Sequence, residues 1–232
     1  VPEKSLWRTL LACSLAASLL FILISISVME LFLGAALVFW LILLVKERTR
    51  PAVPGFFWPL VAFAGLTLIA SALSVNPEMS FVNSRKLFLY LIVPVVMTAA
   101  ATATARALAG RALLASGLIS SIYALAYFAF KAQPGERIKG FMGHPMTQGG
   151  LLLLFLCAAL CFVLFFRDRT RWPWAAGFVL ASAALALTYT RSAWVGFVIA
   201  LSLVLFLYKP AAVLALPFVV GLAVAEMLTS AD

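Results

Sequence analysis

Two short segments combine cationic side chains with glycines or hydroxyls in a way that suits an anionic ligand. The first, RIKGFMGHPMTQGG at 137–150, contains Arg137, Lys139 and His144, the only histidine of the chain. Guanidinium and ammonium groups bind phosphate oxygens strongly, and glycines and proline shape such a loop. We expect the loop to fold back toward the membrane implied by its apolar flanks and to present these side chains to an anion. The same residues also fit an ordinary solvated loop in which Glu136 pairs with the cations.

The second segment is LTYTRSAWVG at 187–196, in which Arg191 stands between hydroxyl-bearing residues. It lies in a short turn between two apolar runs. An arginine at the centre of a bilayer costs about 2.5 to 3.5 kcal/mol on insertion scales, and less near an interface. An arginine kept there usually faces a polar cavity or a ligand, and its guanidinium can form two parallel hydrogen bonds to a phosphate. Snorkelling of Arg191 to lipid headgroups is the alternative explanation.

A third segment, VNPEMSFVNSRKLF, has Arg85 and Lys86 at the start of an apolar run. Two cations at the N-terminus of a helix oppose the helix dipole, so a bound anion would explain them. Contact with lipid headgroups at the interface is the simpler explanation.

Residues that hold divalent metals or carry coupled protons are scarce. The chain has two aspartates, Asp168 and Asp232, and no other soft ligand accompanies Cys157 and Cys161. We therefore expect no metal site and no cofactor. Glutamates also avoid the middle of the apolar runs. Their absence there argues against ion-coupled transport, because transporters commonly use buried carboxylates.

These segments lie between long apolar runs. Hydrophobic residues make up 65% of the 232 residues and charged residues 11%, which is too little polar surface for a soluble globule. Nine apolar runs can be separated, at 10–27, 30–45, 56–73, 87–103, 112–130, 149–166, 172–189, 193–208 and 211–228. In a bilayer, only a helix can hydrogen-bond all of its backbone N–H and C=O groups within a single segment. We predict an all-α polytopic transmembrane helix bundle of about nine spans, a single transmembrane domain with a functional outer loop at 131–150.

The basic residues indicate how the chain crosses the membrane. With a cytoplasmic N-terminus, eleven of them fall in cytoplasmic segments, namely Lys4, Arg8, Lys46, Arg48, Arg50, Arg106, Arg111, Arg167, Arg169, Arg171 and Lys209. Six fall in outer segments, namely Arg85, Lys86, Lys131, Arg137, Lys139 and Arg191. The positive-inside rule therefore favours this orientation. The net charge of +9 comes from short clusters between apolar runs, so nucleic acid is not an expected partner.

In this order and at this spacing, RIKGFMGHPMTQGG followed by LTYTRSAWVG resembles the O-antigen ligase family, whose superfamily also contains O-antigen polymerases. Along the rest of the chain, the resemblance lies only in the number and spacing of the predicted spans. It implies a polytopic glycosyltransferase of the bacterial inner membrane, of the type that uses lipid-linked donors. Such ligases take a glycan from undecaprenyl pyrophosphate at the periplasmic face and join it to lipid A core, by an inverting reaction without metal. The implied partners are that lipid-linked donor, the lipid A core acceptor and membrane lipids.

On this resemblance, Arg191 is the expected catalytic residue, because it would stabilise the charge that grows on the pyrophosphate leaving group. The expected substrate-binding residues are Arg137, Lys139, His144, Arg85 and Lys86. The catalytic histidine of the family lies in a large periplasmic loop after the ninth span, where this chain ends. We therefore expect the base to lie outside this chain, and the chain to be the N-terminal portion of a longer protein.

Two other functions stay open. A polysaccharide polymerase of the same superfamily would use a glycan instead of lipid A core as acceptor, and nothing in these residues selects the acceptor. A transporter or flippase for an anionic lipid-linked substrate would use the outer cations for binding alone. Small residues such as those in LASAALALT favour close helix packing over a polar translocation path.

Overall fold

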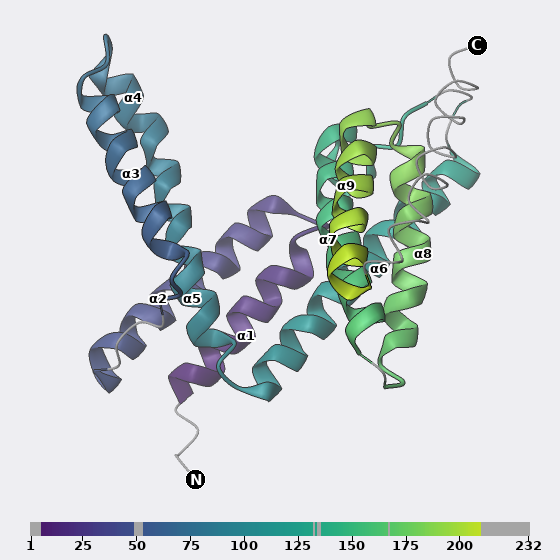
Figure 1. Cartoon of the computed structure of the whole chain (residues 1–232), viewed down its shortest axis with the longest axis horizontal. Coiled ribbons are helices and arrows are strands. Elements are labelled where there is room, and N and C mark those ends of the chain that lie inside the picture. Colours follow the sequence, from purple (N-terminus) through teal and green to yellow (C-terminus); the bar gives the residue numbers. More distant parts are fainter. Residues whose placement is uncertain (1–5, 49–52, 132, 134–135, 167, 210–232) are drawn as a thin grey trace. The chain divides into compact units, whose positions relative to one another are not determined.

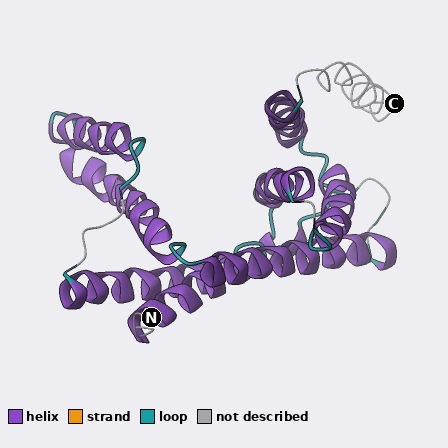
Figure 2. Ribbon diagram, turned by 60° about the horizontal axis from the view of Figure 1, so that its bottom comes forward, coloured by secondary structure: helices purple, strands orange, loops and turns teal. Residues whose placement is uncertain are grey.

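The computed structural model describes residues 6–48, 53–131, 133, 136–166 and 168–209. Every regular element among these residues is a helix, and Figure 2 shows no strand in the described part of the chain. The prediction of an all-α fold is confirmed.

Most of the helices shown in Figure 1 coincide with predicted apolar runs, whereas the short helices at 77–84 and 140–142 lie outside them. They are α1 (Leu6–Phe21), α2 (Ile26–Glu47), α3 (Phe57–Ala72), α4 (Pro77–Ser84), η1 (Arg85–Leu91), α5 (Ile92–Ala99), α6 (Ala103–Phe130), η2 (Gly140–Met142), α7 (Pro145–Phe165), α8 (Arg171–Leu187) and α9 (Arg191–Tyr208). The predicted run at 87–103 corresponds to η1 and α5 together. The predicted span at 211–228 lies outside the described residues.

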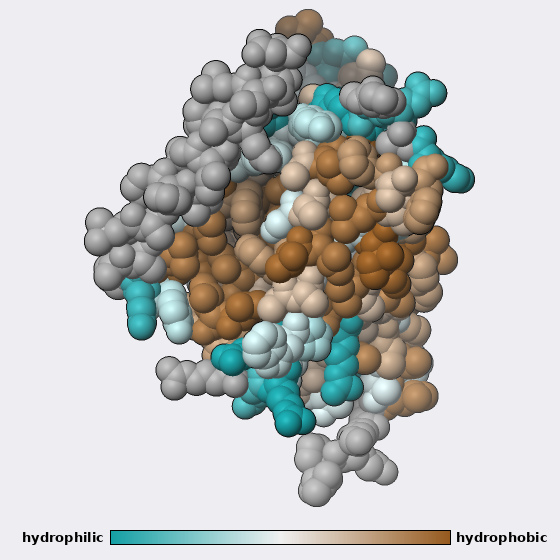
Figure 3. All heavy atoms as spheres, turned by 90° about the vertical axis from the view of Figure 1, so that its right-hand side faces the viewer, coloured by the Kyte–Doolittle hydropathy of each residue, from teal (hydrophilic) through white to brown (hydrophobic). Residues whose placement is uncertain are grey.

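Five helical segments in the described part of the chain are long and apolar enough to cross a membrane. They are Ile26–Glu47, Pro77–Ala99, Ala103–Phe130, Pro145–Phe165 and Arg191–Tyr208. The face in Figure 3 carries a band of hydrophobic side chains with hydrophilic ones at both ends. These features indicate a membrane protein, while the count of nine spans stays a prediction.

The chain forms two compact units, of which the first comprises Val1–Ser18 and Glu30–Gly110. Within it, the Arg8 guanidinium of α1 donates to the Glu47 carboxylate of α2 at 2.6 and 2.9 Å. Trp40 Nε1 donates to Thr98 Oγ1 at 3.1 Å, which joins α2 to α5. Two pairs of serine hydroxyls also link α3 and its C-terminal turn to α4: Ser71 with Ser84, and Ser74 with Ser80, each at 2.8 Å. Hydrogen bonds between helices thus complement apolar packing in this unit.

The second unit comprises Leu19–Met29 and Arg111–Asp232. Here α7 packs against α8 and α9, and Phe155 of α7 is fully buried. Its ring lies against Gly117 of α6 and Gly177 of α8, where an added Cβ would come within 2.1 and 3.2 Å of it. Trp174 of α8 stacks on Phe162 of α7 with ring centroids 4.1 Å apart. Small residues on α6 and α8 therefore create the space for a large aromatic core.

Candidate functional site

The loop between α6 and α7 runs back along one face of α6. Three α6 residues spaced three or four apart, and so on one helix face, contact the loop and then the first turn of α7. The contacts are the Tyr127 hydroxyl to Glu136 Oε1 (3.3 Å), the Tyr123 ring on the Phe141 ring (centroids 3.9 Å apart) and Gln148 Nε2 to Ser120 Oγ (2.8 Å). Because Ser120 lies ten residues before the end of α6, the first turn of α7 is held about 15 Å back along that helix.

Gln148 fixes the start of α7 from inside the protein. It is fully buried, and its Oε1 has no hydrogen-bond partner in the described part of the chain. Gly140 makes room for this amide, because a Cβ there would lie 2.5 Å from Gln148 Oε1 and Cδ. Gly140 also has φ +55°, in the left-handed region that favours glycine. Glycine at position 140 thus allows the loop to pack against the first turn of α7 with the Gln148 amide in its observed place.

Arg137 joins this loop to the turn between α8 and α9. Its Nε donates to Thr188 O at 3.1 Å, and its Nη2 donates to Tyr189 O at 3.1 Å and to Thr190 Oγ1 at 3.4 Å. Beside it, the Ile138 backbone N–H donates to Leu187 O at 3.2 Å. Carbonyls at the C-terminal end of a helix lack intrahelical partners and form the negative end of its dipole. Arg137 therefore caps the end of α8.

The 188–190 turn also touches the start of α7. Thr190 Oγ1 lies 3.3 Å from Pro145 O, and a Cβ on Gly149 would lie 3.2 Å from the Thr190 side chain. Thr190 is the residue that precedes α9, and His144 is the residue that precedes α7. The N-terminal ends of α7 and α9 therefore lie side by side.

This arrangement concentrates positive charge at one end of the second unit. Each N-terminus carries the equivalent of about half a positive charge through its free backbone N–H groups. Lys139, His144 and Arg191 are all exposed there. Glu136 is the only acidic residue in 131–150 and 187–196, and it accepts hydrogen bonds from Tyr127 and from the Gln133 backbone. The arrangement is chemically suited to an anion of more than one charge.

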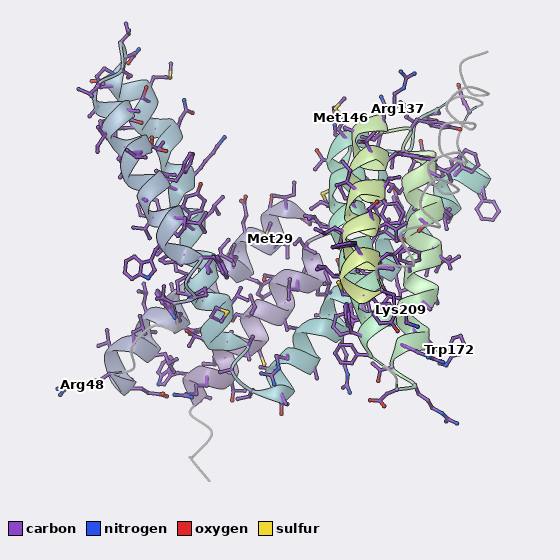
Figure 4. The ribbon with its side chains drawn as sticks, in the orientation of Figure 1. Met29, Arg48, Arg137, Met146, Trp172 and Lys209 are labelled. Atoms are coloured by element: carbon purple, nitrogen blue, oxygen red, sulfur yellow. The ribbon has the colours of Figure 1, made fainter. Side chains whose placement is uncertain are left out.

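The opposite end of the same helices carries other basic residues. Arg137 and Met146 lie at one end of the group formed by α7, α8 and α9, and Trp172 and Lys209 lie at the other (Figure 4). Arg137 and Lys209, which the sequence assigned to opposite membrane sides, therefore lie at opposite ends of this group. Which end faces the cytoplasm stays a prediction.

Among the predicted site residues, four belong to this place. Arg137, Lys139, His144 and Arg191 come from the two segments that meet here. Arg85 and Lys86 begin η1 in the first unit, where Lys86 is exposed. In the described part of the chain no group of three His, Cys, Asp or Glu residues could hold a metal ion.

Sequence reasoning missed two features of the site. The first is the buried Gln148 amide with its partner Ser120, and the second is the use of Arg137 on main-chain carbonyls. The available signal for Gln148 was a polar residue directly before the predicted run at 149–166, because polar residues of a membrane helix usually face a partner.

Comparisons with known proteins identify no relative: no family model, no curated protein and no solved structure matches this chain.

Proposed function

We propose that this protein is a glycosyltransferase of the bacterial inner membrane that joins a glycan from undecaprenyl pyrophosphate to lipid A core at the periplasmic face. The observation that carries the proposal is the meeting of 137–150 with 187–196, through the Arg137 contacts to the 188–190 turn. These are the two segments in which the sequence resembles the O-antigen ligase family, and they are far apart in the chain. A donor site that needs both segments requires such a contact.

The charges at this place support a role for Arg191. It is the first residue of α9 and is exposed, beside the N-terminus of α7. In the proposed reaction an acceptor hydroxyl oxygen attacks the anomeric carbon of the glycan. The bond from that carbon to the phosphate oxygen breaks, and its electron pair stays on the pyrophosphate. A guanidinium and two helix N-termini that are already oriented stabilise this growing negative charge without reorganisation.

Lys139 and His144 complete the proposed donor site. Both are exposed near the same helix ends, and a lysine and an imidazole can donate hydrogen bonds to the pyrophosphate or to its first sugar. No metal is required in this scheme, because cationic side chains supply the counter-charge. The proton of the acceptor hydroxyl passes to a base that we do not assign to these two segments.

The proposal is tested with Arg191→Ala in cells whose lipopolysaccharide depends on this protein. Removal of one preorganised donor typically costs about 100- to 1000-fold in kcat. We therefore expect lipid A core without glycan, with the variant protein still accumulating in the membrane. Arg169→Ala is the matched control, because Arg169 is an exposed arginine at the opposite helix ends, beside Trp172.

The lipopolysaccharide pattern also separates the alternatives. Cores that carry single repeat units would indicate a polymerase, because ligation would then be intact. Glycan attachment at the normal level by Arg191→Ala would overturn the role of Arg191. Movement of a lipid-linked glycan across the membrane without any acceptor would favour a flippase.

A further inference from the structure

We infer that Arg137 is a positioning residue, which acts through the 188–190 turn to hold Arg191 in place, and is not itself a ligand for the substrate. The inference rests on the proposed function, because it assigns Arg137 a task in the same reaction. It changes the expected role of Arg137, which the sequence alone assigned to substrate binding.

The hydrogen bonds of the guanidinium carry the inference. Nε and Nη2 form the side-on edge of the group, which grips a phosphate or carboxylate through two parallel bonds. In this protein the same edge donates to two neighbouring carbonyls, Thr188 O and Tyr189 O, each at 3.1 Å. The edge that is best suited to a phosphate is therefore occupied by the main chain.

The turn that Arg137 binds needs support from outside. Only residues 188–190 separate α8 from α9. Tyr189 adopts φ +48°, a backbone angle that residues other than glycine rarely adopt. The carbonyl of Tyr189 accepts from Arg137, and Thr190 accepts a weaker bond from it at 3.4 Å. The guanidinium thus holds the strained residue and the residue before α9.

Arg191 follows this turn directly and begins α9. A change of backbone angle at Tyr189 or Thr190 therefore alters the direction in which the Arg191 side chain leaves the helix. A displacement of about 1 Å at a reacting centre can cost about 100-fold in rate. Loss of the Arg137 contacts is thus expected to reduce transfer through Arg191, with the donor still bound by other cations.

A double-mutant cycle tests whether the two arginines act together. Arg137→Gln is expected to lower kcat about 100-fold with little change in KM for the lipid-linked donor. In an Arg191→Gln background the same substitution is expected to cause no further loss. Independent losses that multiply would overturn the inference, because they would mean that Arg137 contacts the substrate itself.

Arg137→Lys separates position from charge. Lysine keeps the positive charge but lacks the planar fork that spans two adjacent carbonyls. We expect Arg137→Lys to lose nearly as much kcat as Arg137→Gln. Activity near wild type for Arg137→Lys would overturn the inference in favour of simple charge attraction.

Hydrogen exchange gives a readout that needs no transferase activity. In purified protein, Arg137→Gln is expected to speed amide exchange in peptides that cover 187–194, while Arg169→Gln leaves that exchange unchanged. Unchanged exchange in Arg137→Gln would overturn the positioning role whatever the protein catalyses. Faster exchange in Arg137→Gln would support the contact between Arg137 and the turn. If Arg191→Gln nevertheless transfers at the full rate, both the proposed role of Arg191 and the inference are overturned.

Discussion

Gly140 offers the sharpest test of how the candidate site is built. Replacement by alanine has two costs there: the left-handed backbone at φ +55°, and a Cβ that would lie 2.5 Å from the amide of Gln148. The left-handed backbone costs about 1 to 2 kcal/mol of folding free energy for a residue other than glycine. The Gln148 amide is the flexible end of a side chain, so it can move away, but it then loses its buried hydrogen bond to Ser120. That loss adds about 1 to 3 kcal/mol.

Gly143 is the matched control for this substitution. It has φ +70° in the same loop, but an added Cβ would meet no atom within 4 Å. Gly143→Ala therefore has only the cost of the left-handed backbone. Both variants also lose conformational entropy in the unfolded chain, and this stabilising effect is the same for the two. The contact with Gln148 is the difference between the two, about 1 to 3 kcal/mol.

The assay is the thermal unfolding midpoint of the purified protein in detergent. About 1 kcal/mol shifts the midpoint by roughly 2 to 4 °C in a chain of this size. We expect Gly140→Ala to unfold at a temperature several degrees lower than Gly143→Ala, and Gln148→Ala to remove that difference. Equal midpoints for the two alanine variants would refute the fit between Gly140 and the Gln148 amide.

Other substitutions test the packing and the turn. Gly117→Ala is expected to destabilise the protein by about 1 to 3 kcal/mol, because the new Cβ would lie 2.1 Å from the Phe155 ring, whereas Gly34 has no atom within 4 Å and Gly34→Ala should be tolerated. Equal midpoints for these two variants would contradict the packing around Phe155. Tyr189→Val is expected to lower the midpoint more than Tyr189→Asn, because β-branched residues disfavour positive φ and asparagine tolerates it. The reverse order would argue against a left-handed residue in the turn.

The helices were largely predictable because their cause is local. Long apolar runs must be helical in a membrane, and the boundaries differ from the predicted ones by a few residues in most cases. Two differences are larger: α4 has no counterpart among the predicted runs, and α6 begins at Ala103 and includes Arg106 and Arg111, which lie before the predicted run at 112–130. In the case of α6 the reason is local composition. The segment is rich in alanine, the best helix former. Arg106 also donates to the carbonyls of Ala100 and Ala101, which secures the start of this helix.

The candidate site was predictable only in part. Residue types suggested that 137–150 and 187–196 each suit an anionic ligand, since both contain arginine in a polar break between apolar runs, and the family resemblance assigned both to one donor site. The partner of Arg137 could not be predicted, because it depends on which carbonyls remain unpaired at the end of α8 once α7 packs beside the turn. The burial of Gln148 likewise depends on how the loop returns along α6.

Transfer by the purified full-length protein tests the proposed function most directly. The measurement follows a labelled glycan from undecaprenyl pyrophosphate to lipid A core in reconstituted membranes, with the wild type, Arg191→Ala and Arg169→Ala side by side. We predict that the wild type and Arg169→Ala transfer the label at similar rates, and that Arg191→Ala is slower by about 100-fold or more. Transfer by Arg191→Ala at the rate of the wild type, or no transfer by the wild type, would contradict the proposal.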